Sequence, residues 1–216
     1  VAGTRNFVAI GLNYADHAKE AGLDIPAEPI LFNKAPTSIC GPYDDVMYPR
    51  NSDRMDWECE IAFVIGTRAR YVRESEAVKY IAGYTICNDV SERRFQMKRN
   101  GQWVKGKSAE TFGPLGPYLV TADDIPDPHN LAMSLDVNNA RMQQGSTATM
   151  IFKIPKLLAY VTEFMVLEPG DVVTTGTPPG VGSAKEPPRY LQPGDVMTLQ
   201  IEKLGIQRQT VVPFKM

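Results

Sequence analysis

The stretch DWECEIAFVIG, residues 56–66, has the pattern of a β-strand. Its odd-numbered positions from 57 to 65 are apolar throughout, and they alternate with a second row in which Glu58 and Glu60 are followed by Ala62 and Val64. Period-two alternation in a run rich in branched and aromatic residues predicts a strand. Because the second row changes from acidic to apolar, we expect a core strand that opens into a pocket at the two glutamates.

Glu58 and Glu60 share one face of this predicted strand. Side chains at positions i and i+2 of a strand lie about 6–7 Å apart along the chain, so their oxygens can converge on one hard divalent cation. A second interpretation stays open at this point. An E-x-E pair also occurs where a strand ends in solvent and both carboxylates are simply hydrated.

A third acidic residue ends another predicted strand. The segment YTICNDV, residues 84–90, has strand character and carries Asp89 near its end. Three carboxylates, in a chain with no C-x-x-C motif and no Cys/His cluster, suit Mg²⁺ or Mn²⁺ and would not select Zn²⁺. The sequence therefore contains a candidate metal site made of Glu58, Glu60 and Asp89.

A candidate catalytic pair lies on the first predicted helix. Asn13 is placed to cap a helix over residues 14–22, and a glycine is placed to end it. His17 and Glu20 are one turn apart on the same side of this helix. A carboxylate that orients a histidine ring makes it a suitable general base for water. Such pairs also occur on many exposed helices without any catalytic role.

Lys107 is a further candidate, because a glycine precedes it and small residues follow. In that context a backbone can approach a ligand closely. The nearby Lys98 and Arg99 are interpreted as part of a solvated face, and His129, the only other histidine, as a structural or exposed residue of the turn PDPHN.

The other elements are predicted to be short. A proline- and glycine-rich connection over residues 23–50 contains a strand at 30–32, and a modest helix follows in the segment 75–84. Beyond residue 119 the chain predicts short strands separated by the turn sequences PDPHN, EPGD, TGTPPGVG and QPGD, with one helix over about 154–164. The sequence TGTPPGVG lacks the spacing of a phosphate-binding loop.

Composition excludes several classes of function. The 216 residues are 43% hydrophobic, enough for one domain with a real core. The net charge is −2 and the basic residues are scattered, which argues against a nucleic-acid or membrane partner. Three widely spaced cysteines, Cys40, Cys59 and Cys87, indicate reduced thiols in a cytoplasmic protein. No signal peptide is visible, and we expect residues 1–216 to form one catalytic domain.

Taken in order, these pieces resemble the fumarylacetoacetate hydrolase family over nearly the whole chain. The matching segments are GLNYADHAKE (11–20), PILFNKAPTSI (29–39), the E-x-E strand, YTICNDVSERRFQ (84–96), GKSAETFGPLGP (106–117), MIFKIPKLLAYVT (150–162) and LEPGDVVTTGTPPGVG (167–182). The resemblance implies an α+β fold that is mainly β, a mixed β-sandwich roll with a few short helices, and a homodimer. Members usually have a small N-terminal domain, of which nothing appears before Val1.

The resemblance also implies roles for particular residues. The carboxylates of Glu58, Glu60 and Asp89 match the family's Mg²⁺ or Mn²⁺ site, and His17 with Glu20 match a catalytic pair on a mobile lid. The family's substrate contacts fall on Arg93, Gln96, Lys107, Gly176 and Thr177. The residue after this arginine is acidic in many members but is Arg94 here.

The implied substrate is a 2,4-dioxo acid, whose two oxygens chelate a divalent cation. His17, oriented by Glu20, would activate water for attack at C4, Lys107 would stabilise developing oxyanion charge, and Gly176 with Thr177 would hold the substrate carboxylate. The products would be pyruvate and a second carboxylic acid.

Several alternatives stay open within and beyond this family. The segments SERRFQ, GQWVKGKS and PPRYLQPGD resemble a bacterial subgroup of sugar-acid catabolism, including hydrolases of 2,4-diketo-3-deoxy-rhamnonate or fuconate, and close relatives are labelled ureidoglycolate lyase. The same site could also serve oxaloacetate decarboxylation or oxo-acid hydration and isomerisation. A protein that binds metal without catalysis is the alternative of a different class, against which the complete set of candidate residues argues.

Overall fold

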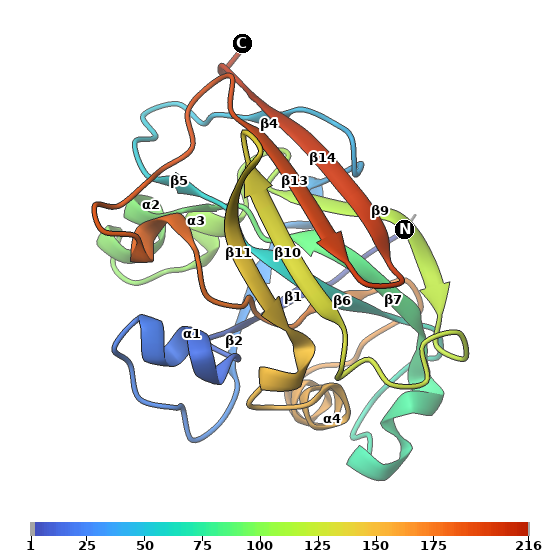
Figure 1. Cartoon of the computed structure of the whole chain (residues 1–216). Helices are drawn as coiled ribbons and strands as arrows, with labels where there is room; N and C mark the ends of the chain where they lie inside the picture. Colours follow the sequence, from blue (N-terminus) through green and yellow to red (C-terminus); the bar gives the residue numbers. More distant parts are fainter. Residues whose placement is uncertain (1–2, 216) are drawn as a thin grey trace.

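Two stacked β-sheets form the body of the protein, which the computed structural model describes for residues 3–215 (Figure 1). The larger sheet has seven strands in the spatial order β2 (Ile30–Lys34), β1 (Phe7–Gly11), β12 (Val172–Thr174), β6 (Cys59–Ile65), β7 (Ile81–Asn88), β9 (Gly113–Thr121) and β3 (Ile39–Cys40). The smaller sheet has five, in the order β11 (Ala140–Ser146), β10 (Ala132–Val137), β13 (Val196–Ile201), β14 (Gly205–Val212) and β4 (Val46–Met47). A separate antiparallel pair joins β5 (Met55–Asp56) to β8 (Ser91–Glu92).

The helices are short and lie around the sheets (Figure 1). The α-helices are α1 (Ala15–Glu20), α2 (Arg93–Lys98), α3 (Val104–Lys107) and α4 (Ile154–Phe164), and the 3₁₀ helices are η1 (Pro36–Ser38), η2 (Glu74–Tyr80), η3 (Thr147–Thr149) and η4 (Gly182–Ala184). Most strand pairs are antiparallel, but β1 with β12, β3 with β9 and β4 with β14 are parallel. The predicted α+β class and the mixed sandwich are therefore confirmed.

Strand β6 lies at the centre of the larger sheet and is buried along its whole length. Its odd-numbered side chains, such as Ile61 and Phe63, share the main core with Leu135 and Leu199 of the smaller sheet. Its even-numbered apolar side chains join a separate small cluster. The alternation in the sequence therefore marks two buried faces, and the glutamates belong to the face turned away from the smaller sheet.

The register of three neighbouring strands assembles the acidic residues. In the pairing of β6 with β7, Cys59 lies opposite Asn88, so the next residues outward, Glu58 and Asp89, also meet. The backbone N–H of Asp89 donates to the carbonyl of Glu58 at 2.9 Å. On the other side of β6, the strand β12 ends at Thr174, beside Glu60.

Several local predictions needed correction. Asn13 does not cap α1, because its side-chain amide is used to bond the carbonyls of Phe152 and Thr175. The segment 75–84 forms the 3₁₀ helix η2 followed directly by β7, and not one α-helix. The helices α2 and α3 were not anticipated, because their charged and glycine-bearing sequence has no apolar periodicity.

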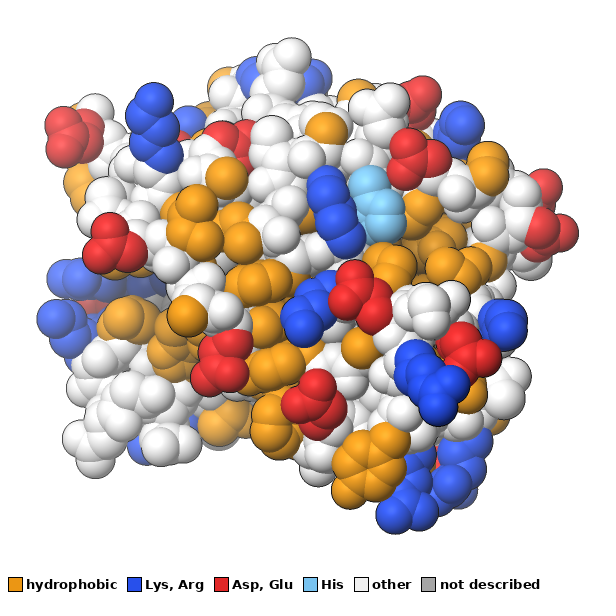
Figure 2. Space-filling model, turned by 90° about the horizontal axis from the view of Figure 1, so that it is seen from below, with side chains coloured by type: hydrophobic (Ala, Val, Ile, Leu, Met, Phe, Trp, Pro, Cys, Tyr) orange, Lys and Arg blue, Asp and Glu red, His pale blue; other side chains and the backbone are white. Residues whose placement is uncertain are grey.

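The charged surface shows no dominant sign on the face that Figure 2 displays. Acidic and basic side chains are interspersed there, with apolar side chains between them (Figure 2). Within residues 3–215, no helix combines the length and the apolar character needed to cross a bilayer.

Asp171 ties the beginning of the described chain to the turn before β12. Its carboxylate accepts hydrogen bonds from the backbone N–H groups of Arg5, Asn6 and Glu168 and from the side-chain amide of Asn6, at 2.7 to 2.9 Å. Burial would raise the pKa of Asp171, but these donors stabilise the ionised form and lower the pKa below its usual 3.8.

We expect Asp171→Asn to lower the free energy of unfolding at pH 7 by about 1–3 kcal/mol. The amide NH₂ group would face N–H donors at the position where a carboxylate oxygen now accepts their hydrogen bonds. Since the folded pKa is depressed, the stabilisation is complete above the ordinary pKa of 3.8 and is lost as pH falls through the folded value. The parent and the variant should therefore converge in acid, as measured by urea unfolding across pH. Asp123→Asn, at an exposed position, is the control; a variant as stable as the parent at pH 7 would contradict the assignment.

Candidate active site

The three predicted metal ligands meet in one buried cluster. One carboxylate oxygen from each of Glu58, Glu60 and Asp89 lies within 4.8 Å of the others. All three side chains belong to buried residues, with Glu58 the most accessible at 7%. The interpretation of the E-x-E pair as hydrated strand-end residues is therefore wrong.

Three cations surround this cluster. Lys107 Nζ lies 2.8 Å from Glu58 Oε2 and 2.7 Å from Asp89 Oδ2, bridging the two carboxylates. Lys34 Nζ lies 2.6 Å from the other oxygen of Asp89. Arg93 Nη2 lies 2.7 Å from Glu58 Oε1. Glu58 and Asp89 are thus each paired with two cations.

These neighbours give Glu58 and Glu60 opposite acidities. Burial alone would raise the pKa of Glu58, but the charges of Lys107 and Arg93 lower it to about 2. Burial, together with the negative charges of Asp89 and Glu58, raises the pKa of Glu60 well above its usual value. The surroundings therefore favour the ionised form of Glu58 and disfavour the ionised form of Glu60, although the two glutamates are only two residues apart.

Glu60 is bound by neutral donors. Its Oε2 accepts from Thr174 Oγ1 at 2.5 Å and from the backbone N–H of Gly176 at 2.8 Å. Among residues 3–215, no lysine or arginine forms an ion pair with Glu60. Glu60 therefore lacks a positively charged partner within the described residues, and a bound cation would favour its ionised form.

The donor set fits a hard divalent cation. The three residues offer only carboxylate oxygens, they converge at a distance that one ion can bridge, and the site is buried. Oxygen ligands of this kind suit Mg²⁺ or Mn²⁺ better than Zn²⁺. Glu58, Glu60 and Asp89 would hold the ion, in agreement with the sequence prediction.

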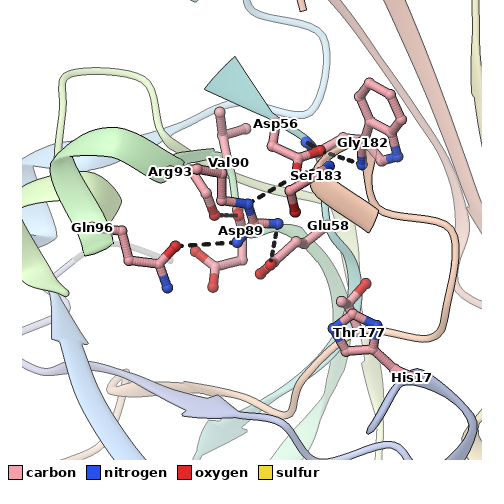
Figure 3. Close-up of polar contacts among 12 residues, drawn as sticks. His17, Asp56, Glu58, Asp89, Val90, Arg93, Gln96, Thr177, Gly182 and Ser183 are labelled. Atoms are coloured by element: carbon pink, nitrogen blue, oxygen red, sulfur yellow. Dashed lines mark hydrogen bonds and ion pairs between the residues drawn. The ribbon is translucent and has the colours of Figure 1, made fainter. Parts of the chain in front are cut away.

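Arg93 links the acidic cluster to the loop at η4 (Figure 3). Besides Glu58, the guanidinium contacts Asp56 Oδ2 at 2.8 Å and Gln96 Oε1 at 3.2 Å. Asp56 in turn accepts from the backbone N–H groups of Gly182 and Ser183 at 2.6 and 3.0 Å. Arg93 and Gln96 are therefore held by the protein itself at the cavity, where both were predicted.

The predicted pair of His17 and Glu20 forms on α1. His17 Nδ1 lies 3.1 Å from Glu20 Oε2, and both Glu20 oxygens accept from the backbone N–H of Gly180 at 3.0 Å. His17 and Glu58 line the same cavity. The position permits a general base to act on a ligand in that cavity, and the role of the pair stays a prediction.

The reason given for Lys107 was wrong, although Lys107 lies in the cluster. A Cβ at Gly106 would come within 2.5 Å of the carbonyl of Glu92 and the N–H of Gln96. The glycine therefore allows α3 to approach α2, and not a ligand to approach the backbone. This close approach places Lys107, the last residue of α3, against the acidic cluster.

Gly176 and Thr177 both line the cavity, but their donors are engaged by the protein. The N–H of Gly176 is directed at Glu60, and Thr177 Oγ1 lies 3.0 Å from the carbonyl oxygen of Cys59 and 2.8 Å from Gln143 Nε2. Their predicted role as a carboxylate-binding pair stays a prediction.

A cavity of about 470 Å³ opens beside the cluster. Eight of the predicted site residues line it, namely His17, Glu58, Glu60, Arg93, Gln96, Lys107, Gly176 and Thr177. Glu20 lines an adjoining cavity together with His17 and Arg93. Asp89 is not part of the cavity lining, and it contacts Lys34 and Lys107.

Two residues that hold the site were missed by the sequence analysis. Lys34, at the end of β2, is 1% exposed and also donates to the carbonyl of Lys107 at 2.5 Å. Asp56 precedes the E-x-E stretch and is fully buried. A lysine inside the apolar run ILFNKA was the available signal for Lys34, because an unpaired lysine is rarely buried.

Arg94, which stands where many family members have an acidic residue, forms an ion pair of its own. The Nε atom of Arg94 lies 3.1 Å from Asp53 Oδ1. Its Nη2 atom donates to the carbonyl of Asn51. Arg94 therefore braces the turn before β5 and is absent from the cavity lining.

A buried carboxylate cluster with a lysine and an arginine, beside a cavity that a histidine also lines, is typical of enzymes that act on small anionic substrates. The sequence matches the family described as "Fumarylacetoacetate (FAA) hydrolase C-terminal" over residues 6–212. The chain belongs to this family, which confirms the resemblance found in the sequence and supports an enzymatic role.

Relatives and solved structures agree with this assignment. The 2,4-didehydro-3-deoxy-L-rhamnonate hydrolase of Sphingomonas sp. (strain SKA58) is 55% identical over 212 residues, which are 98% of this chain and 74% of that protein. The fumarylacetoacetate hydrolase of psychrophilic Exiguobacterium antarcticum superposes with a TM-score of 0.89 at 39% identity, covering 97% and 76% of the two chains. A 2-hydroxyhepta-2,4-diene-1,7-dioate isomerase from Mycobacterium marinum gives 0.86 at 36% identity, with 99% and 76% covered.

We expect Lys34→Met to lower the free energy of unfolding by roughly 3–5 kcal/mol, because it leaves the buried carboxylate of Asp89 without one of its two cations. Urea unfolding in the presence of EDTA measures this loss without a contribution from bound metal. Lys79→Met is the matched control, since Lys79 pairs with Glu76 at the surface and its loss should change stability by less than about 0.5 kcal/mol. Equal stabilities of the two variants would refute the role given to Lys34.

Proposed function

We propose that the protein is a divalent-metal-dependent hydrolase that cleaves a carbon–carbon bond in a 2,4-dioxo acid, giving pyruvate and a second carboxylic acid. The observation that carries this proposal is the buried cluster of Glu58, Glu60 and Asp89 beside a cavity that His17 also lines. Acidic ligands for a cation and a general base for water are the two components that such a hydrolysis requires.

A bound Mg²⁺ or Mn²⁺ ion would supply the Lewis acidity that stabilises negative charge on the oxygens of the oxo acid. His17, oriented by Glu20, takes a proton from water, whose oxygen attacks the C4 carbonyl. The bond between C3 and C4 then breaks, its electron pair stays on the pyruvyl half as an enolate, and C3 receives a proton. Lys107 and Arg93 stabilise the anionic oxygens, and Gln96, Gly176 and Thr177 position the substrate.

The name of the Sphingomonas relative supports a sugar acid as the substrate. That protein is a 2,4-didehydro-3-deoxy-L-rhamnonate hydrolase, and we propose the same class of 2,4-diketo-3-deoxy acid for this chain. We also propose that the protein is a cytoplasmic homodimer. Light scattering coupled to gel filtration tests whether it is a dimer in solution.

Isomerisation is the second candidate, because a 2-hydroxyhepta-2,4-diene-1,7-dioate isomerase has the same fold at 36% identity. The two reactions differ in the use of water. Hydrolysis of the dioxo acid in H₂¹⁸O places label in the new carboxylic acid and releases pyruvate, whereas isomerisation releases neither product. A panel of acylpyruvates, 2,4-diketo-3-deoxy sugar acids and oxaloacetate, each with Mg²⁺ and with EDTA, separates hydrolysis from isomerisation and from decarboxylation.

We expect His17→Ala to lower kcat for the dioxo acid by roughly 10²–10⁴-fold, because the base that activates water is lost. Metal affinity should be unchanged, since His17 makes no contact with the three carboxylates. His129→Ala is the control: it removes the only other histidine, which accepts from the N–H of Ile154 outside the cavity. Parental turnover by His17→Ala would overturn the assignment.

We expect Mg²⁺ or Mn²⁺ to raise the melting temperature of the parent, with a stabilisation of about 2.7 kcal/mol at a concentration 100 times Kd. Glu60→Gln should weaken binding at least about tenfold, because it removes one charged ligand, while its amide oxygen can still accept from Thr174 and Gly176. Glu76→Gln, at the surface, should bind as the parent does. Calorimetric titration measures both, and a parent that binds neither ion would exclude the proposed site.

A further inference from the structure

The cavity has an apolar region that the proposed chemistry does not use. We call six of the apolar side chains that line it the apolar wall: Leu12, Leu23, Ile30, Phe32, Met97 and Trp103. Leu23 and Met97 are each more than half exposed, so they lie towards the mouth. Cavities of roughly 300–1,000 Å³ hold ligands much larger than a pyruvyl group, and this one measures about 470 Å³. The apolar wall therefore has room for the part of the substrate beyond C4.

The apolar wall begins directly beside the catalytic candidates. The ring of Phe32 lies 5.0 Å from Lys107 Nζ, and it packs against Trp103 with 5.2 Å between ring centroids. A Cβ at Gly11 would approach the Trp103 ring to 2.6 Å, so this glycine allows the indole to pack closely against β1. A ligand whose charged head contacts Lys107 would thus extend its remaining atoms along these aromatic rings.

Leu12 is held in a strained backbone conformation to reach the cavity. Its φ is +48°, in the left-handed region that glycine and asparagine adopt at lower cost than leucine. Side chains of this kind that persist in a strained conformation cluster at ligand sites. An asparagine here would relieve the strain but would present an amide to the cavity, so the strain is explained if an apolar side chain is needed at this point.

We propose that the apolar wall is the subsite for the acyl arm beyond C4, that it selects arms ending in an alkyl group, and that Leu12 is a specificity-determining residue. This inference rests on the proposed function and narrows its substrate. A 6-deoxy sugar acid, whose last carbon is a methyl group, satisfies the requirement, and so does a straight-chain acylpyruvate. An arm ending in a hydroxymethyl group places a hydroxyl against side chains that, apart from the indole N–H of Trp103, offer no hydrogen-bonding partner.

The test is a series of acetyl-, propanoyl-, butanoyl- and pentanoylpyruvate with Mg²⁺. In the parent, kcat/KM should rise roughly fourfold for each added methylene, as expected when each is buried against apolar side chains. Leu12→Asn should melt at the parental temperature or above, because its strain is relieved. In this variant kcat/KM should become nearly independent of the length of the acyl arm.

Tyr71→Asn is the matched control. Tyr71 has a φ of +49°, almost the value at Leu12, but it is 66% exposed and absent from the cavity lining. The substitution should relieve the same kind of strain and leave the chain-length dependence as in the parent. The contrast between the two variants separates a backbone effect from a contact with the substrate.

A second measurement is independent of turnover. Calorimetric titration with 2-oxo acids of increasing alkyl length, from 2-oxobutanoate to 2-oxohexanoate, should show Kd decreasing with length in the parent and much less in Leu12→Asn. Absence of pyruvate release from every acylpyruvate and every 2,4-diketo-3-deoxy sugar acid would refute the proposed function but leave this titration able to support the subsite. A flat series in the parent, parental length dependence in Leu12→Asn, unfolding of Leu12→Asn, or a preference for hydroxymethyl-ended over methyl-ended sugar acids would each overturn the inference.

Discussion

The organisation of this protein depends on keeping several carboxylates charged inside a folded core. A buried carboxylate is stable only when cations or hydrogen-bond donors replace the water that it has lost. The cluster pairs three acidic side chains with three cations, namely Asp56, Glu58 and Asp89 with Lys34, Arg93 and Lys107, while Glu60 is held by neutral donors. Each cation comes from a different element, so β2, α2 and α3 must each bring one side chain to the cluster. Charge compensation thus determines which parts of the chain must meet.

Much of this site could be predicted from the sequence, because its acidic residues follow strand geometry. A period of two places Glu58 and Glu60 on one face, and Asp89 ends a strand whose register with β6 brings it opposite Glu58. The pair of His17 and Glu20 was visible for a similar reason, since three residues make nearly one turn of a helix. Regular elements repeat in space, so spacing along the chain converts directly into proximity.

The residues that the sequence did not reveal act over long separations. Lys34 contacts Asp89 across 55 positions, and Asp56 contacts the loop at Gly182 across 126. No local pattern records such contacts. The two short helices α2 and α3 were missed because their formation depends on packing, as the close approach at Gly106 shows, and not on a helical apolar stripe. Asn13 was wrongly predicted to cap the first helix, because an asparagine side chain can either cap a helix or bond distant carbonyls.

The three carboxylates of the metal site and three of the six residues of the apolar wall occupy different kinds of backbone. Glu58, Glu60 and Asp89 lie in or directly beside two central strands, whereas Leu12, Leu23 and Trp103 lie in connecting segments at the rim of the sheet. Substitutions in the connecting segments leave the sheet register unchanged, so such segments can vary without disturbing the groups that perform chemistry. Evolution can therefore alter the accepted substrate in small steps while the reaction is preserved, a separation that suits one scaffold to many related oxo acids.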